Sequence, residues 1–298
     1  MKHLIDIKAL SAEKITALFA QAQQFNQTPI KETRKLHQGR SAIALFFENS
    51  TRTLTSFQLA CQRLGIDITA LNIEHSSTQK GETLCDTLLT LNAMQTDLFI
   101  VRHQQNNIQQ EMSSWLNNET SIINAGDGTN QHPTQGLLDL YTIWQYKQDF
   151  STLKVAIIGD IKHSRVANSL MDGLNTMNVG EISLFAPDEL IPSKTKHLKA
   201  SDMNTCVKDA DVVVMLRIQK ERLPEDLNVD FAQWHEHYGL TNERLKLAKP
   251  EAIVMHPGPM NRGIEISDEV ADGSQSVIWQ QVRNGVLMRQ ALIHKILS

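Results

Sequence analysis

Short, almost continuously apolar segments in the second half of the chain constrain its fold more than any other feature. They occupy residues 154–160, 181–187, 211–216 and 252–255. A strand with one face in water alternates apolar and polar residues, whereas these segments barely alternate, which is typical of parallel strands covered on both faces. Amphipathic segments separate them, so the sequence predicts an α/β fold with central parallel sheets.

The first half of the chain shows the same alternation. Strand-like runs occur at residues 42–47 and 97–102, and a long helix is expected from near Pro133 to about Lys147. With 298 residues and 41% hydrophobic content, the chain can build two cores. We therefore predict two doubly wound domains linked by two interdomain helices. Their ranges are residues 1–133 and 134–283, with a C-terminal helix at 284–298 that packs back on the first domain.

The overall composition argues against several classes of protein. The net charge of −4 does not suit a general nucleic-acid binder or a polybasic membrane-surface protein. The three cysteines lack paired spacing, which indicates neither a zinc site nor a disulfide framework. No signal peptide and no apolar run of membrane-spanning length is visible. We therefore expect a cytoplasmic protein that binds no metal, membrane or nucleic acid.

A polar cluster marks the turn from the run at 42–47 into the next helix. It consists of Ser50, Thr51, Arg52 and Thr53. The first N–H groups of a helix are unpaired and its dipole there is positive, so such a turn suits an anion. Hydroxyls add donors, and a guanidinium matches phosphate geometry. An ordinary N-cap beside an exposed arginine is the simpler interpretation, but this cluster exceeds what capping requires.

Polar side chains also occur at two other strand ends and at one loop-to-helix junction. Arg102 ends a buried run, where it is costly without an anion, although an exposed strand terminus is the alternative. His132 precedes Pro133, with Gln135 close by; a lone histidine is more often structural, but a donor there could stabilise an oxyanion by roughly 3–4 kcal/mol. The turn ending in Arg165 lacks the glycines of a dinucleotide fingerprint, so we expect no nucleotide cofactor. That turn fits a ligand site and a solvated basic turn equally well.

Later segments could bind carboxylate or amide groups. Arg217 and Gln219 are two residues apart, so on an extended segment they point the same way and could hold a carboxylate. A charged helix start is the alternative. The turn containing Pro257 and Gly258 exposes backbone carbonyls that could accept from an N–H, although a plain surface turn has the same composition. Residues 76–83 alone indicate a polar surface loop.

Taken together and in order, these motifs resemble the aspartate/ornithine carbamoyltransferase family. The strings that carry the resemblance are Ser50-Thr51-Arg52-Thr53, His132-Pro133-Thr134-Gln135, residues 159–166, residues 217–222 and residues 256–265. The resemblance extends over nearly the whole chain, up to Leu292. It implies transfer of the carbamoyl group of carbamoyl phosphate to an amine, without a metal or organic cofactor.

The resemblance implies a role for each motif. Carbamoyl phosphate would be bound by Ser50, Thr51, Arg52, Thr53, Arg102, His132, Gln135, Pro257 and Gly258, with Ser76 and Lys80 supplied by an adjacent subunit. The carboxylates of the acceptor would be bound by Lys80, Arg165, Arg217 and Gln219. The residues implied in catalysis are Arg52, Thr53, Arg102 and His132. The resemblance implies a homotrimer with sites shared between subunits, and a regulatory or dihydroorotase-like partner is compatible with the family.

Two features favour L-aspartate over ornithine as the acceptor. The Arg217–Gln219 pair matches the aspartate side of the family, and Gly258 stands where ornithine-specific members typically carry a cysteine. The implied product is N-carbamoyl-L-aspartate, made for pyrimidine (UMP) synthesis. Asn168 replaces a common second arginine, so that position lacks a supporting charge. The alternatives are a carbamoyltransferase for another amine and a non-catalytic assembly subunit, although the latter should have lost phosphate or carbonyl ligands.

Overall fold

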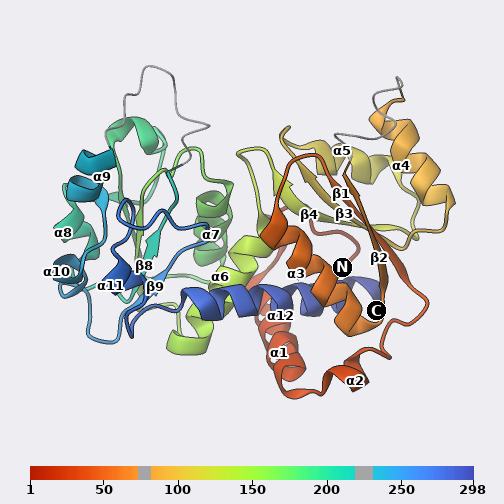
Figure 1. The fold of residues 1–298 in the computed structure, drawn as a ribbon, viewed down its shortest axis with the longest axis horizontal. Helices are drawn as coiled ribbons and strands as arrows, with labels where there is room; N and C mark the ends of the chain where they lie inside the picture. The colour runs from red at the N-terminus through yellow and green to blue at the C-terminus, as the bar shows by residue number, and fades with distance from the viewer. Residues whose placement is uncertain (73–81, 219–230) are drawn as a thin grey trace. The chain divides into compact units, whose positions relative to one another are not determined.

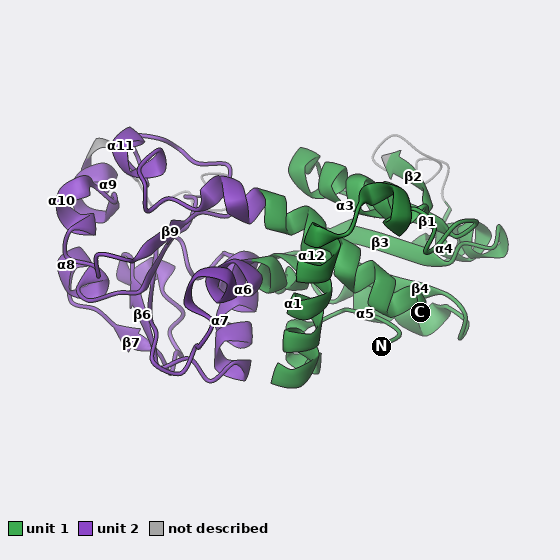
Figure 2. Cartoon of the chain, turned by 90° about the horizontal axis from the view of Figure 1, so that it is seen from below, with its two compact units in different colours: residues 1–138, 283–298 green, residues 139–282 purple. Residues whose placement is uncertain are grey.

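The computed structural model describes residues 1–72, 82–218 and 231–298, and the chain divides into two compact units (Figures 1 and 2). Unit 1 comprises Met1–Leu138 and Arg283–Ser298, and unit 2 comprises Asp139–Val282. The predicted domains divide at the start of helix α6 (Pro133–Lys147), whereas the units divide inside that helix. Helix α12 (Ile278–Leu297) also contributes to both units and begins earlier than the predicted segment at 284–298.

Unit 1 contains a four-stranded, fully parallel sheet. Its strands are β1 (Ser41–Phe46), β2 (Asp67–Asn72), β3 (Leu98–His103) and β4 (Ser121–Asp127), in the order β2-β1-β3-β4. Leu4 adds a parallel bridge to Ile123 beyond β4. The runs predicted at 42–47 and 97–102 are confirmed as β1 and β3. Strand β2 was not predicted, and its described side chains are exposed or half-buried.

Helices cover the sheet of unit 1. They are α1 (Ala12–Gln27), α2 (Ile30–Thr33), α3 (Thr51–Leu64), α4 (Leu84–Ala93) and α5 (Ile108–Trp115), with a 3-10 turn at Ile7–Ala9. Leu88 of α4 and Met112 of α5 pack with Leu45, Phe99 and Ile122 on one face. Alternate strand residues face the other way. Arg289 of α12 lies over the ring of Phe57 in α3, 5.0 Å from its centroid, which ties these two helices together.

Unit 2 contains a five-stranded, fully parallel sheet. Its strands are β5 (Lys154–Ile158), β6 (Glu181–Phe185), β7 (Leu198–Lys199), β8 (Val212–Met215) and β9 (Ile253–Met255), in the order β7-β6-β5-β8-β9. Its remaining helices are α7 (Arg165–Thr176), α8 (Met203–Val207), α9 (Phe231–Tyr238), α10 (Asn242–Leu245) and α11 (Asp268–Ala271), with a 3-10 turn at Asp188–Leu190.

The four apolar runs from which the fold was predicted are β5, β6, β8 and β9 of this sheet. Helices α8, α10 and α11 cover one face of it, and α7 lies on the other (Figure 1). Both sheets are parallel and flanked by helices, so the predicted α/β class with two doubly wound units is confirmed.

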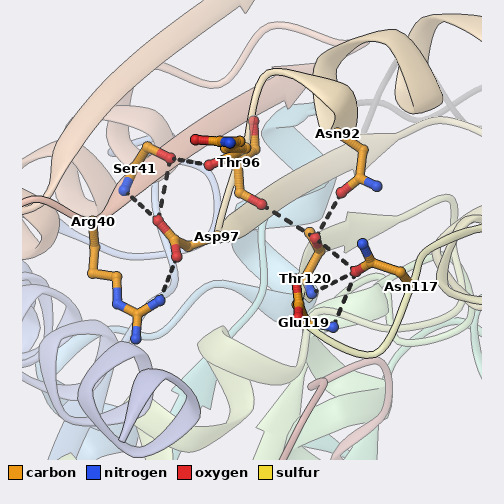
Figure 3. Close-up of polar contacts among 9 residues, drawn as sticks. Arg40, Ser41, Asn92, Thr96, Asp97, Asn117, Glu119 and Thr120 are labelled. Atoms are coloured by element: carbon orange, nitrogen blue, oxygen red, sulfur yellow. Dashed lines mark hydrogen bonds and ion pairs between the residues drawn. The ribbon is translucent and has the colours of Figure 1, made fainter.

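A polar cluster secures the amino ends of the strands in unit 1 (Figure 3). The carboxyl group of Asp97 accepts from the Arg40 guanidinium at 2.6 Å and from the backbone N–H of Ser41 at 2.7 Å. In the same cluster, the hydroxyl of Thr120 donates to Asn92 Oδ1 at 2.6 Å. This edge is opposite the carboxyl ends of the strands, where open α/β sheets bind ligands, so the cluster serves stability.

Replacing Asp97 by Asn is expected to lower stability by about 1–2 kcal/mol near neutral pH. Partial burial favours the neutral carboxyl, but the donors of Ser41 and Arg40 outweigh it and hold the pKa of Asp97 below its usual range. A depressed carboxyl pKa stabilises the fold above the pKa of the unfolded chain, and this stability is lost as the pH falls. The difference between wild type and variant in urea should therefore shrink toward pH 3.

Glu119→Gln is the matched control for Asp97→Asn, because Glu119 is an exposed acid at the same edge. It should leave the urea midpoint unchanged. A pH-independent loss in Asp97→Asn, or no loss at all, would contradict the role given to the Asp97 charge.

Candidate functional site

The site residues of unit 1 follow the carboxyl ends of three adjacent strands. The chain leaves β1 for β2 on one side and then returns to β3 on the other, which makes the gap between β1 and β3 a topological switch point. Ligands of open α/β sheets bind outside the carboxyl ends of the strands at such points. The predicted phosphate cluster follows β1, Arg102 lies near the end of β3, and His132 follows β4.

Helix α3 begins at the predicted anion turn. Ser50 is its N-cap residue, but within the described chain its side chain makes no capping hydrogen bond. Thr51 and Arg52 are exposed, whereas Thr53 is buried. The first turn holds no acid, and a cation there opposes the helix dipole. The exposed guanidinium of Arg52 therefore adds positive charge to an end of α3 that is already positive, a combination that suits an anion.

Arg102 is held beside that turn by its strand and its side chain. It pairs with Phe46 in the register of β1 and β3, and its carbonyl accepts from the N–H of Phe47 at 2.9 Å. Its Nε lies 2.9 Å from Glu48 Oε1, and its Nη1 donates to the carbonyl of Ala125 at 3.3 Å. The guanidinium is therefore oriented in a largely buried setting. Sequence reasoning missed Glu48, whose only signal is an acid two residues before Ser50.

His132 is placed by a closed loop after β4. Asp127 Oδ1 accepts from the N–H of Asn107 at 2.6 Å, and the N–H of Asp127 donates to the carbonyl of Gln131. The carbonyl of His132 accepts from the N–H of Gln135 at 2.9 Å and so starts α6. His132 is only 4% exposed, and Gln135 is half-buried one turn into the helix.

In unit 2 the switch point lies between β5 and β8. Gly159 follows β5 with φ 119°, and a Cβ there would approach the carbonyl oxygen of Leu216 to 2.7 Å, so only glycine fits. Asp160 Oδ1 accepts from the backbone N–H of His163 at 3.2 Å and lies 2.9 Å from its Nδ1. This turn is thus built on Asp160 and not on the glycines of a nucleotide-binding loop.

Arg165 is the first residue of α7 and is 6% exposed. Ser164 caps the helix by accepting from the N–H of Ala167 at 3.1 Å. Like α3, this helix has no acid in its first turn. Each unit therefore places an arginine at the start of the helix that follows a switch-point strand. Asn168 lies half-buried one turn after Arg165.

Arg217 follows β8, where the N–H of Leu216 donates to the carbonyl of Ile158 at 2.8 Å and continues the sheet. The turn with Pro257 and Gly258 follows the neighbouring strand β9. Within it, His256 Nδ1 accepts from the N–H of Gly258 at 2.9 Å. Arg165, Arg217 and the turn thus lie at the same edge of one sheet.

Glu265 joins these segments and was missed by sequence reasoning. Its carboxyl group is fully buried and accepts from three donors. They are the N–H of Ile218 at 2.9 Å and the N–H and side-chain amide of Asn261, both at 2.6 Å. The available signal is an acid between two isoleucines, which is unusual unless the acid is buried with donors.

Several predicted site residues lie outside the described part of the chain. They are Ser76, Lys80 and Gln219. Among the described residues, no group of three or more His, Cys, Asp or Glu side chains is arranged to hold a metal ion. Burial raises the pKa of Cys61 to about 12 and of Cys206 to about 11, which leaves these thiols unreactive. No helix in the described ranges has the length and hydropathy needed to cross a lipid bilayer.

Comparison with known proteins gives a consistent result for both halves of the chain. Residues 2–145 match the carbamoyl-P binding domain of the aspartate/ornithine carbamoyltransferase family, and residues 151–296 match its Asp/Orn binding domain. A structure of aspartate transcarbamoylase from Trypanosoma cruzi with carbamoyl aspartate and phosphate has a TM-score of 0.91 at 31% identity. It is matched over 100% of this chain and 96% of that one.

Two further structures are similar. The same Trypanosoma cruzi enzyme in complex with N-(phosphonacetyl)-L-aspartic acid has a TM-score of 0.90 at 32% identity, over 100% of this chain and 96% of that one. Ornithine carbamoyltransferase from Thermus thermophilus has a TM-score of 0.87 at 21% identity, over 100% and 99% of the chains. The latter likeness concerns the fold alone.

Proposed function

The chain belongs to the aspartate/ornithine carbamoyltransferase family, and from this premise we propose that it transfers the carbamoyl group of carbamoyl phosphate to L-aspartate. The observation that carries the proposal is the pair of arginines at each switch point. In unit 1, Arg52 follows β1 and Arg102 lies near the end of β3. In unit 2, Arg165 follows β5 and Arg217 follows β8. One substrate is an acyl phosphate and the other a dicarboxylate, and both suit guanidinium groups.

The donor is assigned to unit 1. Ser50, Thr51, Arg52 and Thr53 offer hydroxyls, a guanidinium and helix N–H groups to the phosphate. Arg102, His132 and Thr53 polarise the carbonyl oxygen, where negative charge grows as the tetrahedral intermediate forms. Preorganised donors at that position accelerate the reaction because they stabilise the transition state more than the substrate.

The acceptor is assigned to unit 2. Arg165 and Arg217, with Gln219, hold the two carboxylates of aspartate. The same guanidinium groups would repel the side-chain ammonium of ornithine. The carbamoyl NH₂ belongs to the donor, and we assign it to the side-chain oxygen of Gln135 and to the carbonyls of Pro257 and Gly258. Lys80 of an adjacent subunit is assigned to both substrates, carbamoyl phosphate and aspartate.

The reaction needs positioning more than covalent chemistry. The aspartate nitrogen forms a bond to the carbonyl carbon, and the bond from that carbon to the phosphate oxygen breaks. We assign the proton lost by the amine to the departing phosphate, which is a stronger base than a carboxylate. The products are N-carbamoyl-L-aspartate and inorganic phosphate, with no metal or organic cofactor. This product feeds pyrimidine (UMP) synthesis in the cytoplasm.

An acceptor assay tests the function directly. Purified chain with carbamoyl phosphate should release phosphate and form carbamoyl aspartate from L-aspartate. Ornithine should react with a kcat/KM at least roughly 10²-fold lower, because it lacks the side-chain carboxylate of aspartate and places an ammonium near arginine. Preference for ornithine, or no transfer to either amine, would refute the proposal.

We also propose that the working form is a homotrimer with shared sites. The support is the family match together with Ser76 and Lys80, which correspond to residues implied to act in a neighbouring subunit. Light scattering should give three times the chain mass of 33.6 kDa. Arg52→Ala and Lys80→Ala trimers should each be nearly inactive, but subunit exchange between them should restore activity, because some mixed sites regain both native residues. A fully active monomer, or mixtures that stay inactive, would contradict sharing.

A further inference from the structure

A buried glutamine holds the start of the turn that contains Pro257 and Gly258. Gln281 of α12 accepts from the backbone N–H of His256 through its Oε1 at 3.1 Å. Through its Nε2 it donates to Asp139 Oδ1 of α6 at 2.7 Å. Gln281 is 2% exposed and Asp139 is fully buried. All three residues belong to unit 2, and together they form one buried relay from Asp139 through Gln281 to His256.

The roles of donor and acceptor are fixed along this relay. The N–H of His256 can only donate, so the oxygen of the Gln281 amide must face it. The amide NH₂ then faces the carboxyl oxygen of Asp139, which accepts. Burying such groups costs free energy unless each bond is made. A buried glutamine between a carboxyl group and a backbone N–H therefore fixes the backbone at His256 far better than an apolar residue would.

The other parts of the turn are fixed as well. His256 Nδ1 accepts from Gly258, and Glu265 accepts from the backbone N–H of Asn261. Between these anchors lie the carbonyls assigned to the carbamoyl NH₂. The relay through Gln281 also ties the turn to α6, the helix that begins with Pro133 after His132.

We infer that Asp139 and Gln281 are positioning residues for carbamoyl transfer: they aim the carbonyls of Pro257 and Gly258 at the reacting group. This inference rests on the proposed function of that turn. Neither residue is expected to touch a substrate. Their loss should lower kcat and raise the KM for carbamoyl phosphate, while the affinity of unit 1 for inorganic phosphate stays unchanged.

Two variants test the relay: a single substitution at Gln281 that breaks it, and a double variant that restores it with the amide and carboxyl group exchanged. Gln281→Glu places two carboxyl groups at the relay distance, where ionisation of both at high pH removes the hydrogen between them and sets two like charges against each other. Its kcat/KM should fall at least about tenfold at pH 8 and recover toward pH 6, where one group can carry a proton. Gln280→Glu, the same change at the preceding and less buried glutamine, is the matched control and should behave like wild type.

A double variant that combines Asp139→Asn with Gln281→Glu should restore the relay. The amide and the carboxyl group have then exchanged places, so the side chain at position 139 donates to the one at position 281. The new carboxyl group still accepts from the backbone N–H of His256. Activity should therefore return at all pH values between 6 and about 8, where the single variant is impaired at the upper end.

Amide hydrogen exchange around His256 supplies a readout that needs no turnover. Protection should be lost in Gln281→Glu at pH 8 and regained in the double variant, with the affinity for inorganic phosphate unchanged throughout. The inference is overturned if Gln281→Glu behaves like wild type, if the double variant is no better than the single one, or if phosphate affinity falls in parallel. Wild-type protein that transfers nothing to aspartate contradicts the proposed function instead, because exchange still reports the relay.

Discussion

Arg52→Ala should abolish detectable carbamoyl transfer while leaving the fold intact. Two charge-assisted hydrogen bonds to the phosphate, each worth about 1.5–3 kcal/mol, together correspond to a loss in kcat/KM of roughly 10²–10⁴-fold. The affinity for inorganic phosphate should fall as well. Stability should not fall, because Arg52 is exposed and its charge opposes the dipole of α3. Steady-state kinetics, phosphate titration and a thermal melt together measure these effects.

Arg63→Ala is the matched control, since Arg63 lies in the last turn of the same helix. It removes the same charge far from the anion turn and should leave both kinetics and phosphate affinity near wild type. Equal losses of activity and phosphate affinity in the two variants would indicate a general effect of charge. That result would contradict the role of Arg52 in phosphate binding.

His132→Ala is expected to lower kcat by roughly 10²–10³-fold with little change in KM. A donor that acts on the developing oxyanion matters mainly in the transition state, and removing one such donor costs about 3–4 kcal/mol. The start of α6 should survive, because it uses the carbonyl of His132 and not the imidazole. Pre-steady-state measurement of the chemical step separates this effect from product release.

His132→Gln keeps an N–H donor on the side chain and should recover part of the rate, which a purely structural role would not explain. His3→Ala is a suitable control, because His3 is a histidine of the same unit whose ring lies at the sheet edge and accepts from Ile122. Unchanged kcat in His132→Ala, or a loss confined to KM, would contradict carbonyl polarisation.

The strands could be predicted from the sequence where burial on both faces leaves a continuous apolar run. This holds for Val155, Val213 and Val254 and their neighbours, all of which are buried. Strand β2 lies at the edge of its sheet with Asp67 and Thr69 exposed, so its sequence carries no such run. The start of α12 was also missed, because Trp279 and Val282 are exposed and blur the helical pattern.

The candidate site was predictable to the extent that parallel strands bring their carboxyl ends to one edge. Arg52 and Arg102 share an edge because β1 and β3 are neighbours, and Arg165 and Arg217 because β5 and β8 are. The supporting residues were not predictable in this way. Glu48 and Gln281 act through partners that are distant in the chain, as their bonds to Arg102 and His256 show. Only packing reveals such pairs.

A crystal structure with N-(phosphonacetyl)-L-aspartate would show where both substrates bind, because that compound joins a phosphonate to an aspartate. We expect the phosphonate at the start of α3, bonded to Ser50, Arg52 and Thr53. We expect the two carboxylates on Arg165 and Arg217. A phosphonate bound away from α3, or carboxylates that contact neither arginine, would contradict the assignment of donor and acceptor to the two switch points.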